Sequence, residues 1–171
     1  VQIFESEYIN DSKVDDFQLY SAALVVDVET GEIMGHYGGH GNSDLTRFST
    51  GFPMASLVKP FVLLELLEQG YPINLELYDG PIAGKFTPQN NNHQYSYRHI
   101  GITEILQHSL NAPMVNIREI TDPLPLYRSV ENRFKSMSIS EDPYLDLNDP
   151  SKQSEITLNY PLGSRNMTLF D

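Results

Sequence analysis

One helix that is apolar on almost every side constrains the fold of this chain more than any other feature. Plotted at about 100° per residue, residues 56–69 have a single narrow polar strip, which consists of Glu65, Glu68 and Gln69. A helix that is apolar over the rest of its surface belongs in the interior of a domain. Pro60 is tolerated only within the first helical turn and Gly70 is suited to end the helix. The helix is therefore predicted to begin near residue 56.

Ser56 and Lys59 lie one turn apart on the side of this helix opposite the polar strip. Burial disfavours an ammonium group, so Lys59 needs a partner, a cavity or a lowered pKa. A serine at a helix N-terminus with a lysine one turn later is the pattern of a base-activated nucleophile. The same residues equally fit a plain Ser56 N-cap with Lys59 extended to the surface, because Ser-x-x-Lys alone is a common sequence.

Composition excludes several kinds of function. The 171 residues, 40% hydrophobic and 20% charged, suit one globular domain or a large part of one. The net charge of -12, without any run of Lys or Arg, argues against nucleic acid as a partner. The chain has no cysteine, which excludes disulfides and thiolate metal sites. No apolar run could span a bilayer, and Val1 stands where an initiator Met would be, so we expect a processed piece whose targeting segment or membrane anchor lies upstream.

The first half of the chain predicts strands around the central helix. Residues 1–20 are polar and acidic and are interpreted as an irregular lead-in segment. Residues 22–28 and 32–37, separated by a turn, predict an antiparallel β-hairpin. Residues 38–44 predict a flexible glycine-rich loop. Residues 71–99 carry turn formers and amides with little periodicity, which indicates a long surface excursion.

The second half predicts short helices. Thr103 is expected to cap one of them, and Pro113 to lie in the first turn of the next. A third helix should begin near Asp122-Pro123, with apolar residues at helical spacing: Leu126, Val130, Phe134 and Met137. Residues 138–154 are predicted to be loop, and residues 156–164 alternate briefly, as in a strand, before a glycine turn.

Together these segments resemble the transpeptidase domain of the penicillin-binding proteins, and more closely the bifunctional class A kind. The matching motifs follow the family's order and spacing from about residue 20 to 171: residues 23–27, 30–33, 56–61, 67–70, 88–90, 101–106, 109–113, 162–164 and 168–169. The resemblance implies a mixed α/β (α+β) fold of the β-lactamase/transpeptidase type. In that fold an antiparallel sheet is flanked by helices and one central helix is buried.

The resemblance also implies a set of catalytic roles. Ser56 would attack the penultimate D-Ala carbonyl of a peptidoglycan stem peptide ending in D-Ala-D-Ala, and an amine from a neighbouring strand would resolve the acyl-enzyme. Lys59 would accept the Ser56 proton, and Ser109 would pass it to the departing D-Ala. Asn111 would bind the substrate amide and Lys59, while the Ser56 N–H would form half of an oxyanion hole. β-Lactams would acylate the same serine, and no cofactor or metal is implied.

Two departures from the family pattern lead to further expectations. Ala55 stands where class A proteins usually have glycine, which is acceptable if its φ is negative. The family's Lys-Thr/Ser-Gly motif is absent, since the Thr-Gly steps here precede Ser56 and lack the lysine. We therefore expect residues 21–171 to be the first part of a transpeptidase domain, an incomplete domain that is inactive by itself. Its expected location is the bacterial cell envelope, outside the cytoplasmic membrane, where cell-wall synthesis proteins are candidate partners.

Two alternative functions remain open. A D,D-carboxypeptidase or serine β-lactamase would use the same nucleophile and base but would admit water to the acyl-enzyme. A degenerate transpeptidase fold would instead act as a non-catalytic envelope scaffold or partner-binding module. A metalloenzyme is not predicted, because His36 and His40 flank a glycine pair and lack the glutamate of a zinc protease motif.

Overall fold

The computed structural model describes residues 23–37, 51–91, 94–137 and 139–167. The predicted lead-in segment 1–20 and glycine-rich loop 38–44, which includes His40, lie outside these residues. The described residues divide into a hairpin and a larger body, and each is described by itself. No helix in these ranges is long and apolar enough to cross a membrane.

The hairpin consists of β1 (Ala23–Val26) and β2 (Ile33–Tyr37), which pair antiparallel as predicted. Asp27 stabilises the turn because one of its carboxylate oxygens accepts the backbone N–H groups of Glu29 and Thr30, at 3.0 and 2.8 Å. Gly31 follows with φ +72°, a conformation that glycine adopts without steric cost.

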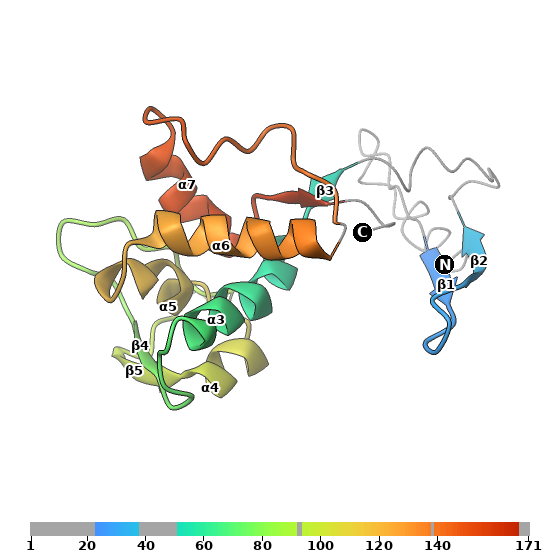
Figure 1. Cartoon of the computed structure of the whole chain (residues 1–171). Coiled ribbons are helices and arrows are strands. Elements are labelled where there is room, and N and C mark those ends of the chain that lie inside the picture. The colour runs from blue at the N-terminus through green and yellow to red at the C-terminus, as the bar shows by residue number, and fades with distance from the viewer. Residues whose placement is uncertain (1–22, 38–50, 92–93, 138, 168–171) are drawn as a thin grey trace, which may run out of the picture. The chain divides into compact units, whose positions relative to one another are not determined.

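The central helix α3 (Val58–Glu68) is preceded by the 3-10 turn η1 (Ala55–Leu57). In Figure 1, α3 lies between α6 (Pro123–Ser136) and α4 (Ile102–Gln107). Its core side chains are almost completely inaccessible to solvent: Val58, Val62, Leu63 and Leu66. Gly70 follows the C-cap residue Gln69 with φ +95°, the conformation of a glycine that ends a helix, as predicted.

The predicted polar strip of α3 does not face solvent along its whole length. Glu65 is only 8% exposed, because α6 covers it. Arg133 of α6 donates to one Glu65 carboxylate oxygen from Nε and Nη2, at 3.2 and 2.9 Å. The charged side chain is thus part of the α3–α6 contact, where its desolvation is offset by an ion pair.

The interpretation of residues 71–99 as a surface excursion is wrong at both ends. β4 (Glu76–Asp79) and β5 (Arg98–Gly101) form an antiparallel pair, with Leu77 and Asp79 buried. Residues between the two strands return to this pair through hydrogen bonds to the Asp79 carboxylate. The two strands are only four residues each, which is too short for an alternating pattern to be recognised in the sequence.

Two further elements pair across the body: β3 (Phe52–Pro53) and β6 (Asn166–Met167) are antiparallel. The mixed α/β class is therefore confirmed. The described residues contain three separate two-stranded sheets rather than the single sheet flanked by helices that was expected.

Two short helices, α4 and α5 (Ala112–Val115), lie where the sequence predicted them, but the predicted cap of α4 differs from the observed one. α4 is capped by Gly101, so the prediction for Thr103 as its cap is wrong. α5 has Pro113 in its first turn and continues into the 3-10 turn η2 (Asn116–Glu119), which confirms that part of the prediction.

The C-terminal part of the body contains one confirmed helix and one that was missed. Asp122 caps α6 by accepting the Leu124 N–H at 3.1 Å, as predicted, but Met137 lies beyond the helix end and is 54% exposed. Where alternation indicated a strand, the chain forms α7 (Gln153–Asn159) and the 3-10 turn η3 (Tyr160–Leu162).

Candidate active site

Ser56 lies in the η1 turn and is exposed to solvent. The preceding residue, Ala55, has φ +48°, so the condition of a negative φ, under which alanine would be acceptable there, is not met. The Ala55 N–H donates to the Gly163 carbonyl at 3.1 Å, and the Met54 N–H donates to the Arg165 carbonyl at 2.7 Å. The segment after η3 therefore holds the turn that presents Ser56.

Lys59 is 1% exposed, so its side chain does not extend to the surface. Its Nζ donates to the Ser109 carbonyl at 2.7 Å, to Asn111 Oδ1 at 2.8 Å and to Ser109 Oγ at 3.2 Å. Burial lowers the pKa of Lys59 to about 8, because the ammonium loses its hydration. The predicted need for a partner is thus met by two neutral residues.

Ser109 joins the two predicted catalytic residues of α3 and η1. Its Oγ donates to Ser56 Oγ at 2.9 Å and accepts from Lys59 Nζ. Within the described ranges, Lys59 makes no direct hydrogen bond to Ser56. Ser109 has φ +50°, a strained conformation for a residue with a Cβ. A hydroxyl chain therefore runs from Ser56 through Ser109 to the buried amine.

Asn111 completes the group of four predicted site residues, all of which the structure brings together. Its Oδ1 accepts from Lys59 and its Nδ2 donates to the Gln89 carbonyl at 3.3 Å. The neighbouring Asn90 is 3% exposed and accepts the Asn111 backbone N–H at 2.8 Å. Sequence reasoning matched residues 88–90 to a family motif but assigned Asn90 no role.

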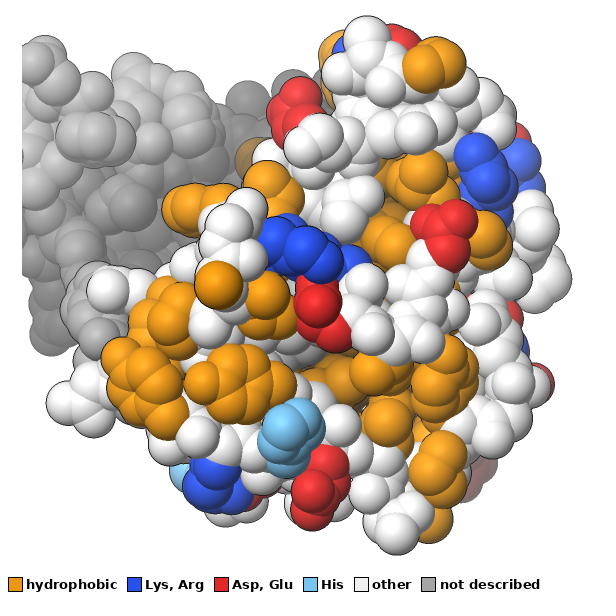
Figure 2. Space-filling view, turned by 90° about the vertical axis from the view of Figure 1, so that its left-hand side faces the viewer, with side chains coloured by type: hydrophobic (Ala, Val, Ile, Leu, Met, Phe, Trp, Pro, Cys, Tyr) orange, Lys and Arg blue, Asp and Glu red, His pale blue; other side chains and the backbone are white. Residues whose placement is uncertain are grey.

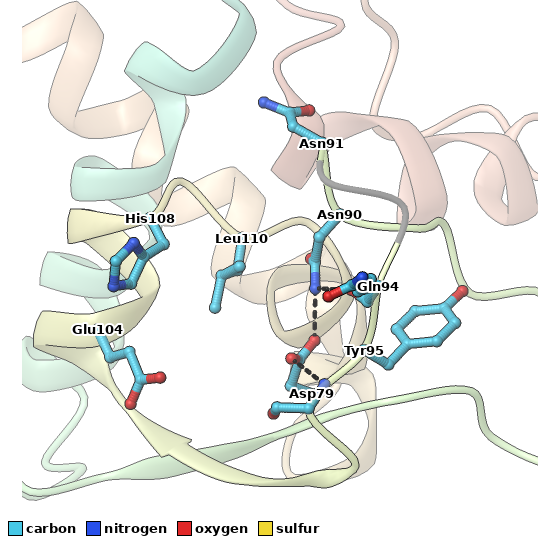
Figure 3. Close-up of a pocket in the computed structure, with 9 residues that line it drawn as sticks. Asp79, Asn90, Asn91, Gln94, Tyr95, Glu104, His108 and Leu110 are labelled. Carbon is cyan, nitrogen blue, oxygen red and sulfur yellow. Dashed lines mark hydrogen bonds between the residues drawn. The ribbon is translucent and has the colours of Figure 1, made fainter.

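A cavity of about 410 Å³ lies beside this group, on the side of Asn90 and Leu110. In Figure 3, Glu104 of α4 and His108, which directly follows α4, stand on one side, and Gln94 and Tyr95 on the other. The lining residues are mostly polar: Asp79, Asn90, Asn91, Gln94, Tyr95, Ser96, Glu104, His108 and Leu110. The cavity wall thus includes the loop that carries Ser109 and Asn111.

Surface charge and metal-binding groups add little to this site. On the face that Figure 2 shows, basic side chains are scattered and form no broad basic surface. In the part of the chain that the structure describes, no group of three His, Asp or Glu side chains could hold a metal ion. The site brings together two serine hydroxyls and a buried amine, groups that can act as nucleophile and base.

Comparison with known protein families gives a match over most of the chain. The family model described as the penicillin binding protein transpeptidase domain matches residues 21–156. A search of curated proteins found no match.

Proposed function

This chain belongs to the penicillin-binding protein transpeptidase family, and on that premise we propose that it is a serine D,D-transpeptidase whose nucleophile is Ser56. Domains of this family act on peptidoglycan in the cell envelope. The proposed substrate is a stem peptide ending in D-Ala-D-Ala. β-Lactams are proposed to acylate the same hydroxyl.

The observation that carries this proposal is the hydrogen-bond chain from Ser56 Oγ through Ser109 Oγ to Lys59 Nζ. A serine hydroxyl is a weak nucleophile until a base removes its proton. Lys59 can be that base only when it is neutral. With a pKa of about 8, roughly one Lys59 in ten is neutral at pH 7, against about one in three thousand for an ordinary lysine.

The distances around Lys59 indicate which proton it gives up. A charged ammonium donates three hydrogen bonds, and Nζ has three acceptors. The bond to Ser109 Oγ, at 3.2 Å, is the longest, while those to the Ser109 carbonyl and Asn111 are 2.7 and 2.8 Å. Loss of the proton from the longest bond leaves the lone pair facing Ser109 Oγ.

The proposed acylation then follows from rotation of two hydroxyl groups. Ser109 O–H turns to donate to neutral Lys59, and Ser56 O–H donates to Ser109. As Ser56 Oγ bonds to the D-Ala carbonyl carbon, its proton passes to Ser109 and the Ser109 proton passes to Lys59. The terminal D-Ala leaves with a proton returned through Ser109. An acceptor amine then displaces Ser56 and restores the hydroxyl.

The position of Ser56 also supports stabilisation of the oxyanion. Backbone N–H groups in the first turn of a helix lack partners within the helix and can stabilise negative charge. Ser56 lies in the η1 turn directly before α3. Its N–H is proposed as one donor to the tetrahedral intermediate.

Labelling of the full-length protein with a fluorescent penicillin tests the nucleophile. Ser56→Ala should abolish labelling. The matched control is Ser136→Ala, because Ser136 is an exposed serine whose Oγ donates to the Arg133 carbonyl at 2.7 Å and, among the described residues, to no other group. Labelling that survives in Ser56→Ala, with both variants folded, would contradict the proposal. Fast hydrolysis of nitrocefin by the wild-type protein would indicate a β-lactamase instead.

A further inference from the structure

We propose that Asn90 is a positioning residue that fixes Asn111, and through it the partners of Lys59, at the proposed active site. The effect on acylation rests on the proposed function. The effect on the geometry around Lys59 does not depend on the proposed function, so the effect on acylation and the effect on geometry can be tested separately.

The start of α5 shows why Asn90 is needed. An asparagine at a helix N-cap ordinarily accepts an N–H of its own helix through its side chain. Asn111 occupies the N-cap of α5 but makes no such bond, because its Oδ1 accepts from Lys59. Asn90 Oδ1 accepts the N–H groups of Asn111 and Ala112 instead, at 2.8 and 3.1 Å. Capping by Asn90 thus leaves the Asn111 side chain available to Lys59.

Asn90 is itself fixed by a second pair of bonds, visible in Figure 3. Its Nδ2 donates to Asp79 Oδ1 at 2.8 Å and to the Gln94 carbonyl at 2.9 Å. The other Asp79 oxygen accepts the Ser96 N–H at 2.8 Å. Asp79 is 2% exposed and ends β4. The Asn90 amide is therefore hydrogen-bonded at both ends. It lies between the β4–β5 sheet and the loop that carries Ser109 and Asn111, called the catalytic loop below.

Both ends of the amide are required at position 90. The Oδ1 end must accept two N–H groups, while the Nδ2 end must donate to a buried carboxylate. An aspartate would keep the acceptor but place a second carboxylate against Asp79, and an alanine would leave the N–H groups and the carboxylate without partners. Since Ser109 has φ +50°, loss of this anchor would let the loop relax away from Lys59.

Asn90→Ala is the main test, and Asn116→Ala is its matched control. Asn116 is 2% exposed and its Nδ2 donates to the Tyr78 and Gly80 carbonyls, at 2.9 Å each. In the part of the chain that the structure describes, its side chain makes no hydrogen bond to Lys59, Ser109 or Asn111. Both variants lose a buried amide near β4, so both should lose stability, whereas only Asn90→Ala removes the bond to the catalytic loop.

Two measurements on the full-length protein separate the outcomes. The rate of acylation by fluorescent penicillin should fall by about 10- to 100-fold in Asn90→Ala, as expected for a misplaced catalytic group. The pKa of Lys59, followed by NMR of ¹³C-labelled lysine, should rise toward its ordinary value as water enters. Asn116→Ala should change neither. A folded Asn90→Ala variant with wild-type rate and wild-type Lys59 pKa would overturn the inference.

A charge-conserving exchange gives an independent test if Asn90→Ala does not fold. Asn90→Asp alone should reproduce its defects, whereas Asp79→Asn together with Asn90→Asp should recover part of both, because the donor and acceptor of that pair are exchanged. The positioning role would be refuted if the double variant had the same acylation rate and the same Lys59 pKa as Asn90→Asp alone. If the wild-type protein takes up no penicillin, the proposed function fails, and the Lys59 pKa still decides the role of Asn90.

Discussion

The contact between Gly163 and the residue before Ser56 offers a sharp test of how the proposed nucleophile is held. Gly163 has φ +90°, and its carbonyl accepts the Ala55 N–H. A Cβ at position 163 would lie 1.9 Å from the Ala55 carbonyl oxygen and 2.3 Å from its Cα. These are backbone atoms, so Gly163→Ala cannot be accommodated by turning a flexible side chain.

Gly163→Ala should lower the free energy of unfolding for two separate reasons, and Gly70→Ala measures one of them alone. Gly70 has φ +95°, nearly the same, but a Cβ there meets nothing within 4 Å. Gly70→Ala should therefore cost only the left-handed backbone conformation, about 1–2 kcal/mol. Gly163→Ala adds displacement of packed backbone, which typically costs about 1–3 kcal/mol more. Its expected total loss is about 2–5 kcal/mol.

Chemical denaturation of both variants measures the difference, and penicillin labelling measures its effect on Ser56. Gly163→Ala should lose more unfolding free energy than Gly70→Ala. It should also label more slowly, because the η1 turn must move to make room for the methyl group. Gly70→Ala should label at the wild-type rate. Equal unfolding free energies for the two variants, or unimpaired labelling in Gly163→Ala, would refute the claim that this contact positions Ser56.

Three further predictions follow from single features of the structure. The acylation rate should rise with pH through about 8 and then level off, because only neutral Lys59 accepts a proton and the neutral fraction grows as pH rises. An acylation rate that does not change between about pH 6 and pH 10 would contradict this. Arg133→Ala should cost about 2–4 kcal/mol in denaturation experiments by leaving the buried Glu65 carboxylate unpaired, whereas Lys135→Ala, which removes an exposed pair, should change stability little. Ala55→Gly should raise the unfolding free energy by about 0.5–1 kcal/mol, since glycine relieves the strain of φ +48°.

The central helix and its lysine could be predicted from sequence because the signal is local. A run that is apolar nearly all round must be buried, and burial requires Lys59 to find partners. Asp122 before Pro123 likewise marks the start of α6 by a local capping rule. Such features depend on residues within one or two helical turns of each other.

Short elements were harder to predict because their pattern fits more than one structure. Residues 156–164 alternate like a strand, yet the buried side chains of Ile156 and Tyr160 are four residues apart, the spacing of α7 and η3. Asp79 sits in a segment of turn formers, and nothing local reveals that β4 pairs with β5. Tertiary contacts decide such elements.

The buried polar groups explain why a catalytic motif can be found by sequence while its support cannot. Ser56, Lys59, Ser109 and Asn111 are the residues proposed to carry the chemistry, and their types and order could be recognised in the sequence. Asn90 performs a task that any correctly placed backbone or side-chain acceptor could perform, namely to accept two N–H groups of α5. What makes it an asparagine is Asp79, eleven residues away, which needs a donor at the other end of the same amide. A residue defined by two partners in separate elements has no local signature, and only the folded chain brings those partners together.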